Sequence, residues 1–300
     1  MSARAWTLFA AVSVIWGLPY LLIKVAIEGG MPPLSIAALR VALAALALLA
    51  LARRAGSLGS LRGRWRWLAI FAVVEVALPF PLISAGETRI ESSTAAILIA
   101  TAPLVAAVLA LRLEPEERLG GARLAGLVVG LAGVAALVGV HVETGGGELL
   151  GILAVLLAAC GYAAGAMILK HRLGGLDPVA AMAATMAIAA VPLAPPLALT
   201  LPGAEVSGGA LLAVLALGLV PTAAGMVLMA MLVREAGPGR SLVVTYLNPV
   251  VAVLLGVVFL GENPGAGVFA GLALILLGSW LSTEGRLPWL ARRPSERPTE

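Results

Sequence analysis

The sequence predicts an all-α membrane protein in which ten transmembrane helices form two inverted repeats of five helices. Three observations lead to this fold class. The composition is too apolar for a chain that folds in water, the apolar segments are long enough to cross a bilayer, and the second half of the chain repeats the first.

The composition excludes an ordinary soluble domain. Of the 300 residues, 61% are hydrophobic and only 12% are charged, whereas a soluble domain carries roughly 25% charged residues. Because hydrocarbon offers no partners to backbone N–H and C=O groups, only helices or a closed barrel can span it. The long apolar runs lack the alternation typical of barrel strands, so we expect helices.

Charge and motifs exclude several classes of function. The net charge is +4, but the arginines are scattered among short loops without interleaved aromatic residues, so no nucleic-acid partner is expected. The single Cys160 lies in an apolar segment, and His141 and His171 are isolated, so we expect no metal and no other cofactor. The sequence has no HExxH, GxSxG or P-loop motif, so no catalytic residue is expected.

Ten apolar segments are close to the ~20 residues that a helix needs to cross the bilayer core. The predicted spans are residues 5–27, 34–52, 67–86, 92–112, 120–140, 148–169, 177–199, 209–233, 239–260 and 265–282. The first segment is interrupted by Gly17 and Pro19 and has no signal-peptide cleavage site, so it is interpreted as a retained span.

The last third of the chain resembles its beginning at an offset of about 146 residues. For example, Pro103–Leu109 returns as Pro249–Leu255, and Trp16 corresponds to Tyr162. Duplicated sets of spans are typical of secondary transporters, whose substrate site lies where the two copies meet. The expected division is a first repeat over residues 1–144, a glycine linker over 145–147, a second repeat over 148–283 and a disordered cytoplasmic tail over 284–300.

The distribution of basic residues predicts the orientation. With a cytoplasmic N-terminus, all of the 20 lysines and arginines except Lys24, Arg40 and Arg89 fall in cytoplasmic loops or termini, as the positive-inside rule requires. Both termini are therefore expected in the cytoplasm. Because each repeat has five spans, the second copy enters the membrane from the opposite side, which makes the repeats inverted.

Glycines and prolines inside the spans are candidates for packing and hinge positions. Small-xxx-small patterns let helix backbones approach closely, although glycine facing lipid can also be merely tolerated. Proline removes a backbone donor and kinks its helix, either as a hinge of a central cavity or as a bend with no further role. The packing candidates are Gly126, Gly130, Gly267 and Gly271, with a third pattern at Gly161 and Gly165. The hinge candidates are Pro79, Pro103, Pro221 and Pro249.

Two ionisable residues within the spans are candidates for function, because charge in the bilayer is costly. Glu75 lies midway along the third span and could bind a substrate ammonium group or exchange a proton, unless a neighbouring helix satisfies it or it is held neutral. Arg40 lies about two turns into the second span. It could bind a substrate carboxylate, pair with a glutamate such as Glu28, Glu87 or Glu91, or extend to the interface.

Polar aromatic side chains suit the wall of a wet cavity that holds an organic substrate. Trp16 and Tyr20 share one face of the first span, and Tyr162 is equivalent to Trp16 in the second repeat. Anchoring at the membrane interface is the alternative for such residues. The predicted substrate-binding residues are Trp16, Tyr20, Glu75, Phe80, Thr101, Tyr162, Tyr246 and Asn248, with Arg40 as a charge partner.

A series of motifs runs in order through the chain. It comprises Trp16-Gly17 and Lys24, Pro32-Pro33 and Arg40, Ala102-Pro103, Asn248-Pro249 and Leu260-Gly261-Glu262. Over residues 5–283 this ordered set resembles the drug/metabolite transporter (DMT) superfamily and, within it, the ten-span EamA-type exporters. The resemblance implies two EamA-like repeats in a bacterial inner membrane that export small metabolites, with the amino-acid exporters, including an aromatic branch, among the most similar. Since only 5% of the residues are aromatic, a broader range of amino acids is expected.

These expectations combine into a secondary transporter that works by alternating access, with a small-molecule substrate and the lipid bilayer as its partners. Proton coupling through Glu75 is a hypothesis, and the sequence predicts no oligomeric state. An exporter of organic cations similar to small multidrug transporters is the alternative within the class. A membrane-embedded lipid-modifying enzyme would need a cluster of acids or histidines at one membrane face, which the sequence lacks, and a channel is a further alternative.

Overall fold

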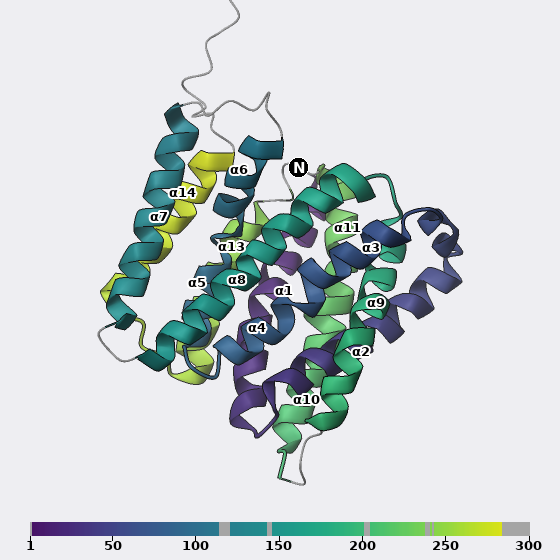
Figure 1. Ribbon diagram of the computed structural model, residues 1–300, viewed down its shortest axis with the longest axis horizontal. Coiled ribbons are helices and arrows are strands. Elements are labelled where there is room, and N and C mark those ends of the chain that lie inside the picture. Colours follow the sequence, from purple (N-terminus) through teal and green to yellow (C-terminus); the bar gives the residue numbers. More distant parts are fainter. Residues whose placement is uncertain are drawn as a thin grey trace, which may run out of the picture.

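The computed structural model describes residues 2–113, 121–142, 146–200, 205–237, 241 and 243–283, and throughout these ranges the secondary structure is helical (Figure 1). In chain order the elements are α1 (Ala3–Glu28), α2 (Pro33–Arg54), η1 (Ser57–Leu61), α3 (Trp65–Ala72), η2 (Val73–Ala77), α4 (Pro79–Gly86), α5 (Ser92–Ile99), α6 (Ala102–Leu113), α7 (Gly121–Val142), α8 (Gly146–Ile168), η3 (Leu169–Leu173), α9 (Pro178–Leu199), α10 (Gly208–Leu217), η4 (Gly218–Ala224), α11 (Gly225–Ala236), α13 (Val244–Leu260) and α14 (Ala266–Thr283). The elements η2, η3 and η4 are short π-helical segments, and η1 is a 3₁₀ helix.

Within the described ranges, eight helical stretches are long and apolar enough to cross a membrane. They are Ala3–Glu28, Pro33–Arg54, Trp65–Gly86, Ser92–Ala110, Gly121–Gly139, Gly147–Leu173, Pro178–Leu199 and Gly208–Ala236. The last two of the ten predicted spans coincide with shorter apolar helices, Val244–Leu260 and Ala266–Ser282. With 17 residues, α13 extends about 26 Å at 1.5 Å per residue, slightly less than the ~30 Å hydrocarbon core.

Two predicted boundaries bear on the expected repeat division. The helix α8 begins at Gly146, so Gly146 and Gly147 of the predicted linker belong to a helix. Residue 145 of this linker lies outside the described residues. The predicted cytoplasmic tail over 284–300 also lies outside them.

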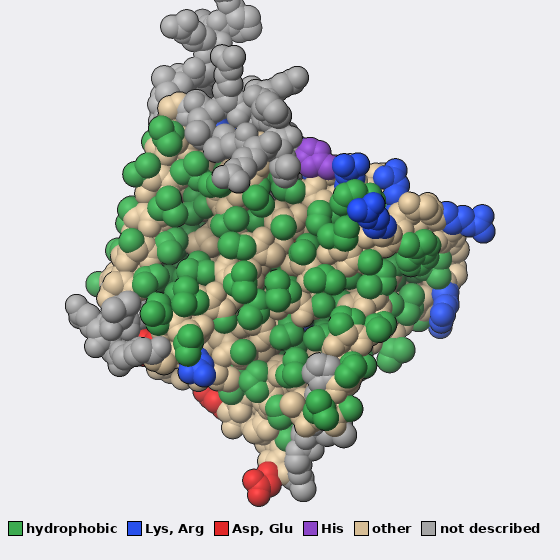
Figure 2. Space-filling view, viewed as in Figure 1, with side chains coloured by type: hydrophobic (Ala, Val, Ile, Leu, Met, Phe, Trp, Pro, Cys, Tyr) green, Lys and Arg blue, Asp and Glu red, His purple; other side chains and the backbone are tan. Residues whose placement is uncertain are grey.

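The outer surface is apolar, as lipid contact requires. Figure 2 shows hydrophobic side chains over the middle of one face and charged side chains mostly towards its margins. Large exposed side chains include Leu46, Leu212, Val258 and Phe259, each more than 60% exposed. In water such a surface would be an aggregation site, whereas in a bilayer it is the solvated face.

At one edge of the bundle, α7 and α14 lie side by side (Figure 1). Glycine brings their backbones together, because a Cβ added to Gly278 would lie 2.5 Å from the Cα of Gly130 and 2.6 Å from the carbonyl oxygen of Gly126. Gly271 opposes Gly133 in the same way, with the Gly133 oxygen 3.3 Å from the added Cβ. A Cβ on Gly130 would also collide with the Leu104 side chain of α6. The predicted Gly267 is half-buried in α14.

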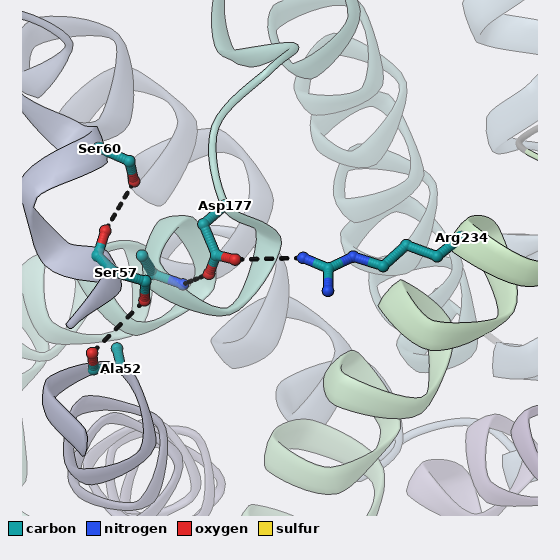
Figure 3. Close-up of polar contacts among 6 residues, drawn as sticks. Ala52, Ser57, Ser60, Asp177 and Arg234 are labelled. Carbon is teal, nitrogen blue, oxygen red and sulfur yellow. Dashed lines mark hydrogen bonds and ion pairs between the residues drawn. The ribbon is translucent and has the colours of Figure 1, made fainter. Parts of the chain in front are cut away.

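Exposed polar contacts join several loops at one end of the bundle. Figure 3 shows Asp177, which accepts a hydrogen bond from the Ala180 N–H at the start of α9 and forms a 3.2 Å ion pair with Arg234 at the end of α11. The same view shows Ser57, whose hydroxyl donates to the Ala52 carbonyl at 3.4 Å. The Arg234 side chain is 68% exposed, so its ion pair adds little stability.

The close contact of α7 with α14 makes Gly278 intolerant of a side chain. Gly278→Ala should lower the free energy of unfolding by about 1–3 kcal/mol, because the added methyl meets backbone atoms that cannot rotate away. Thermal unfolding of the detergent-solubilised protein measures this effect. Gly139→Ala in α7 is the matched control, since nothing lies within 4 Å of its added Cβ. Equal melting temperatures for the two variants would contradict the packing.

Candidate functional site

Two π-helical segments occupy equivalent places in the two halves of the chain. Under the offset of about 146 residues, η2 with Glu75 corresponds to the part of η4 around Pro221. π-Helical turns inside α-helices are frequent at functional sites. Both segments have a local cause, because proline cannot donate the backbone hydrogen bond of a regular helix.

In η4, a side chain bonds to the carbonyl to which the proline cannot donate. Pro221 has no N–H for the carbonyl of Leu217, and the Thr222 hydroxyl donates to that carbonyl at 2.8 Å instead. In the other half, Pro79 cannot donate to the carbonyl of Glu75, and the preceding Leu78 N–H bonds to Val73 with π-helical spacing at 2.9 Å. Each proline therefore loosens its span next to a polar residue.

Arg40 of α2 is held at the loosened part of η4. Its guanidinium Nε donates to the Thr222 oxygen at 2.7 Å, and its Cζ lies 3.8 Å from the centre of the Phe80 ring in α4. Arg40 is only 7% exposed. Its Nε is the only guanidinium nitrogen that bonds to a described residue, so the two terminal NH₂ groups remain available to a ligand.

Aromatic hydroxyls from both halves surround this arginine. Tyr20 of α1 and Tyr162 of α8 both lie within electrostatic reach of Arg40, and Tyr162 is also within reach of Glu75. Tyr20 is buried and Tyr162 is half-buried. The structure thus brings together five of the predicted residues, Tyr20, Arg40, Glu75, Phe80 and Tyr162.

The Glu75 carboxylate packs against Gly165 of α8. A methyl group at Gly165 would collide with the Glu75 carboxylate, and one at Gly161 would lie 2.5 Å from the Val74 carbonyl oxygen and 3.0 Å from Pro79 Cγ. The Gly161-xxx-Gly165 pattern therefore gives room to η2 and its carboxylate. Among the described residues, no hydrogen bond or ion pair engages this carboxylate.

Trp16 of α1, which is equivalent to Tyr162 under the repeat offset, contacts η4, which is equivalent to η2. Its indole Nε1 donates to the Pro221 carbonyl at 3.1 Å. A Cβ added to Gly225 would lie 2.6 Å from that nitrogen and 3.2 Å from Ile15 Cγ2. Under the repeat offset, the pair Ile15 and Gly225 corresponds to Gly161 and Pro79, so the same helix contact occurs twice with large and small residues exchanged.

Other predicted residues lie apart from Arg40. Thr101 is buried at an interruption between α5 and α6, just before Pro103, and donates to the Leu98 carbonyl at 2.6 Å. Tyr246 and Asn248 are half-buried on α13, where the Asn248 Oδ1 is buried and has no hydrogen-bond partner. The helix α13 continues through Pro249 without interruption.

Two residues of this site, Thr222 and Gly225, were not expected from the sequence, and Gly165 was expected only as a packing position. Thr222 had a signal, because a hydroxyl directly after a proline inside a span can bond the carbonyl that the proline leaves free. The small-residue pattern at Gly161 and Gly165 indicated close packing there, but it does not name the side chain that Gly165 accommodates.

Thr222 links Arg40 to the helix, so its hydroxyl should matter to stability. Thr222→Val leaves the Arg40 Nε unpaired and removes the side-chain donor to the Leu217 carbonyl, which should cost about 1–3 kcal/mol of unfolding free energy, and Thr222→Ser should recover most of it. Thr185→Val is the control, since this buried hydroxyl only donates to the Ala181 carbonyl four residues earlier. Equal losses of melting temperature at positions 222 and 185 would argue against the proposed link.

Comparisons with known proteins agree with this fold. A profile of the EamA-like transporter family matches residues 4–139 and again 149–283. A probable terminal-alkyne amino-acid exporter of Streptantibioticus cattleyicolor is 30% identical over 94% of this chain and 93% of its own length. A probable amino-acid metabolite efflux pump of Salmonella typhimurium is 27% identical over 95% and 96%, and the uncharacterized inner membrane transporter YedA of Escherichia coli K12 is 28% identical over 92% and 89%.

A solved structure also shares the fold. A chain titled "Crystal structure of protein" superposes with a TM-score of 0.68 over 98% of this chain and 100% of its own, at 22% sequence identity. Because the family profile matches twice and covers most of the sequence, the family assignment does not depend on one distant relative. The chain belongs to the EamA-like transporter family.

Proposed function

We propose that this transporter exports amino acids, or small metabolites with a free carboxylate, across the bacterial inner membrane. The observation that carries the proposal is the buried Arg40, whose Nε is fixed by Thr222 while its terminal NH₂ groups bond to no described residue. A guanidinium with two free, parallel N–H groups is suited to bind a carboxylate in a bidentate manner. The ring of Phe80 under the guanidinium restrains its plane.

A second group in reach suits the amino end of such a substrate. Glu75 is a carboxylate without a partner among the described residues, and Tyr162 lies within electrostatic reach of both Glu75 and Arg40. An arginine and a glutamate that are both within reach of one tyrosine offer one site for a carboxylate and one for an ammonium group. Two relatives are named as exporters of amino acids or their metabolites, which supports the same substrate class.

For the mechanism, we propose ten spans in two inverted halves that expose the site alternately to each side. Support comes from the two contacts that the repeat offset relates, Ile15 with Gly225 and Gly161 with Pro79. Each joins the first span of one half to the third span of the other, as a twofold relation between the halves requires. Loosening one of the two contacts while the other is kept would open the site to one side of the membrane or to the other.

Export of organic cations is the second candidate function. It is favoured by the unpaired Glu75 carboxylate, because such a carboxylate can bind a cation without any contribution from Arg40. The two candidates differ in the partner that the substrate requires. A carboxylate-bearing substrate depends on Arg40, whereas an organic cation depends on Glu75 alone.

Exchange in liposomes tests the proposal. The purified protein in liposomes loaded with unlabelled amino acid should take up the radiolabelled amino acid saturably, and tetraphenylphosphonium should not compete. Arg40→Lys should raise the half-saturating concentration at least about tenfold, because lysine offers a point charge in place of the fork, while Arg89→Lys at an exposed arginine should not. Absence of saturable exchange for every amino acid would refute the proposal, and exchange of the cation alone would favour the second candidate.

Gly165 provides a test of Glu75 that separates position from folding. Gly165→Ala should displace the Glu75 carboxylate, lower the melting temperature and reduce amino-acid exchange by about tenfold or more. Adding Glu75→Ala removes the colliding group, so the double variant should regain stability without regaining exchange. Recovery of exchange in the double variant would show that Glu75 has no role in transport.

A further inference from the structure

A second group of buried polar residues lies apart from the residues that contact Arg40 directly. It is formed where the end of α1, the turn after α4, the start of α5 and the turn after α13 meet. We call it the Glu87 cluster, and its members are Lys24, Glu87, Ser92, Ser93 and Glu262.

One carboxylate of the Glu87 cluster is fully engaged. Glu262 Oε1 accepts from the Ser92 N–H at 2.7 Å, and its Oε2 accepts from the Ser93 N–H at 3.1 Å. These are free N–H groups in the first turn of α5, where a negative charge is also favoured by the helix dipole. Glu262 therefore acts as a cap supplied by a distant segment of the chain.

The ammonium group of the Glu87 cluster is engaged with main chain. Lys24 Nζ donates to the carbonyl of Glu87 at 3.0 Å and to that of Ile90 at 3.3 Å. These bonds hold the turn after α4 against α1. Among the described residues, no ion pair joins Lys24 to the Glu87 carboxylate.

The Glu87 carboxyl group has no hydrogen-bond partner among the described residues. Glu87 is 0% exposed, and both of its carboxyl oxygens are buried without a hydrogen-bond partner. An ionised carboxylate in such a place would lose its hydration without any N–H donor to replace it. The neutral acid, which needs only one acceptor for its single O–H, is the form that this packing accommodates.

The charges that face Glu87 come from three neighbouring elements. They are Lys24 of α1, Arg40 of α2 and Glu262 after α13, and the hydroxyl of Tyr20 also lies within electrostatic reach. Glu87 follows the third span, which ends at Gly86. Burial raises the pKa of the Glu87 carboxyl well above its usual range, and Glu262 adds to the rise, while Lys24 and Arg40 oppose it.

We propose that Glu87 is the proton-binding site of this transporter, neutral while the Glu87 cluster is closed and ionised when this end of the bundle opens to water. The inference rests on the proposed transport function. In the predicted orientation this end faces away from the cytoplasm. The carboxylate takes a proton from the water on that side as the end closes and returns it to the same water when the end opens again.

This assignment differs from the hypothesis that Glu75 exchanges the proton. Glu75 is only half-buried and lies between Gly165 and Tyr162, so a substrate ammonium can supply its counter-charge. Glu87 is sealed, and its nearest ammonium, Lys24, is committed to main-chain carbonyls. Closing this end therefore demands protonation of Glu87 and of no other member of the Glu87 cluster.

A stability measurement tests proton binding without any substrate. Because the folded-state pKa of Glu87 is above the unfolded value of about 4.3, its contribution to stability is complete at low pH and is lost as the pH rises towards the folded pKa. Glu87→Gln retains the shape of the neutral acid but cannot ionise. The melting temperature of wild type should therefore fall relative to Glu87→Gln by about 3 °C per pH unit, beginning above about pH 4.3.

Control variants make this result specific. Glu28→Gln, at an exposed glutamate at the end of α1, should melt in parallel with wild type at every pH. Glu87→Asp retains a titratable group and should retain the pH-dependent decline, which keeps the test available if Glu87→Gln does not fold. Parallel melting curves for wild type and Glu87→Gln, or a Glu87→Asp variant without the decline, would overturn the assignment.

Transport then tests the role of the proton. In liposomes at equal pH on both sides, the exchange rate of wild type should depend on pH, because this end of the bundle must release a proton each time it opens, whereas the exchange rate of Glu87→Gln should not vary with pH beyond about twofold. The same pH dependence of exchange in both proteins would refute the proton site. If wild type exchanges no substrate, the proposed function fails, and the melting experiment still decides whether Glu87 binds the proton.

Discussion

Proline at positions 79 and 221 leaves the carbonyl groups of Glu75 and Leu217 without their usual helical donors. In a membrane these groups must find partners inside the protein. At Leu217 the partner is the Thr222 hydroxyl, which then accepts a hydrogen bond from Arg40. A buried charge is thereby attached to the loosened part of one half, while its face rests on Phe80 of the other half. The position of the proposed substrate site follows from this chain of bonds.

Two buried ionisable groups, Arg40 inside the second span and Glu87 just after the third, differ in how they are satisfied. Arg40 is held by the Thr222 hydroxyl and the Phe80 ring, and Tyr20 and Tyr162 lie within electrostatic reach of it. Glu87 has no hydrogen-bond donor among the described residues, so its closed environment fits the neutral form. An arginine stays charged at any physiological pH, whereas a carboxyl group changes its charge by exchanging one proton. Substrate recognition and proton exchange can therefore reside on different residues of one connected interior.

The class of fold and most helix positions were predictable because hydropathy and length are local properties. The predicted second span, 34–52, corresponds to α2 from Pro33 to Arg54, and the third, 67–86, to the stretch Trp65–Gly86. The site was only partly predictable. Glu75 and Arg40 were identified from the sequence as rare charges in apolar runs. The packing of Glu75 against Gly165 was not, because it joins residues far apart in sequence. Glu87 directly follows the third predicted span, 67–86. Its burial was not predictable, because it depends on the packing of α1 and on the turn that carries Glu262.

Binding of a substrate carboxylate by Arg40 is the central claim, and competition between an amino acid and its carboxamide tests it directly. The purified protein is equilibrated with the labelled amino acid that exchanges best, and the unlabelled acid and its carboxamide are compared as competitors. The carboxamide keeps the side chain and the ammonium group but lacks the anion that pairs with the guanidinium. The account predicts that the acid displaces the label at least about tenfold more strongly than the carboxamide, and that Arg40→Lys narrows this difference. Equal displacement by both compounds on wild type would contradict it.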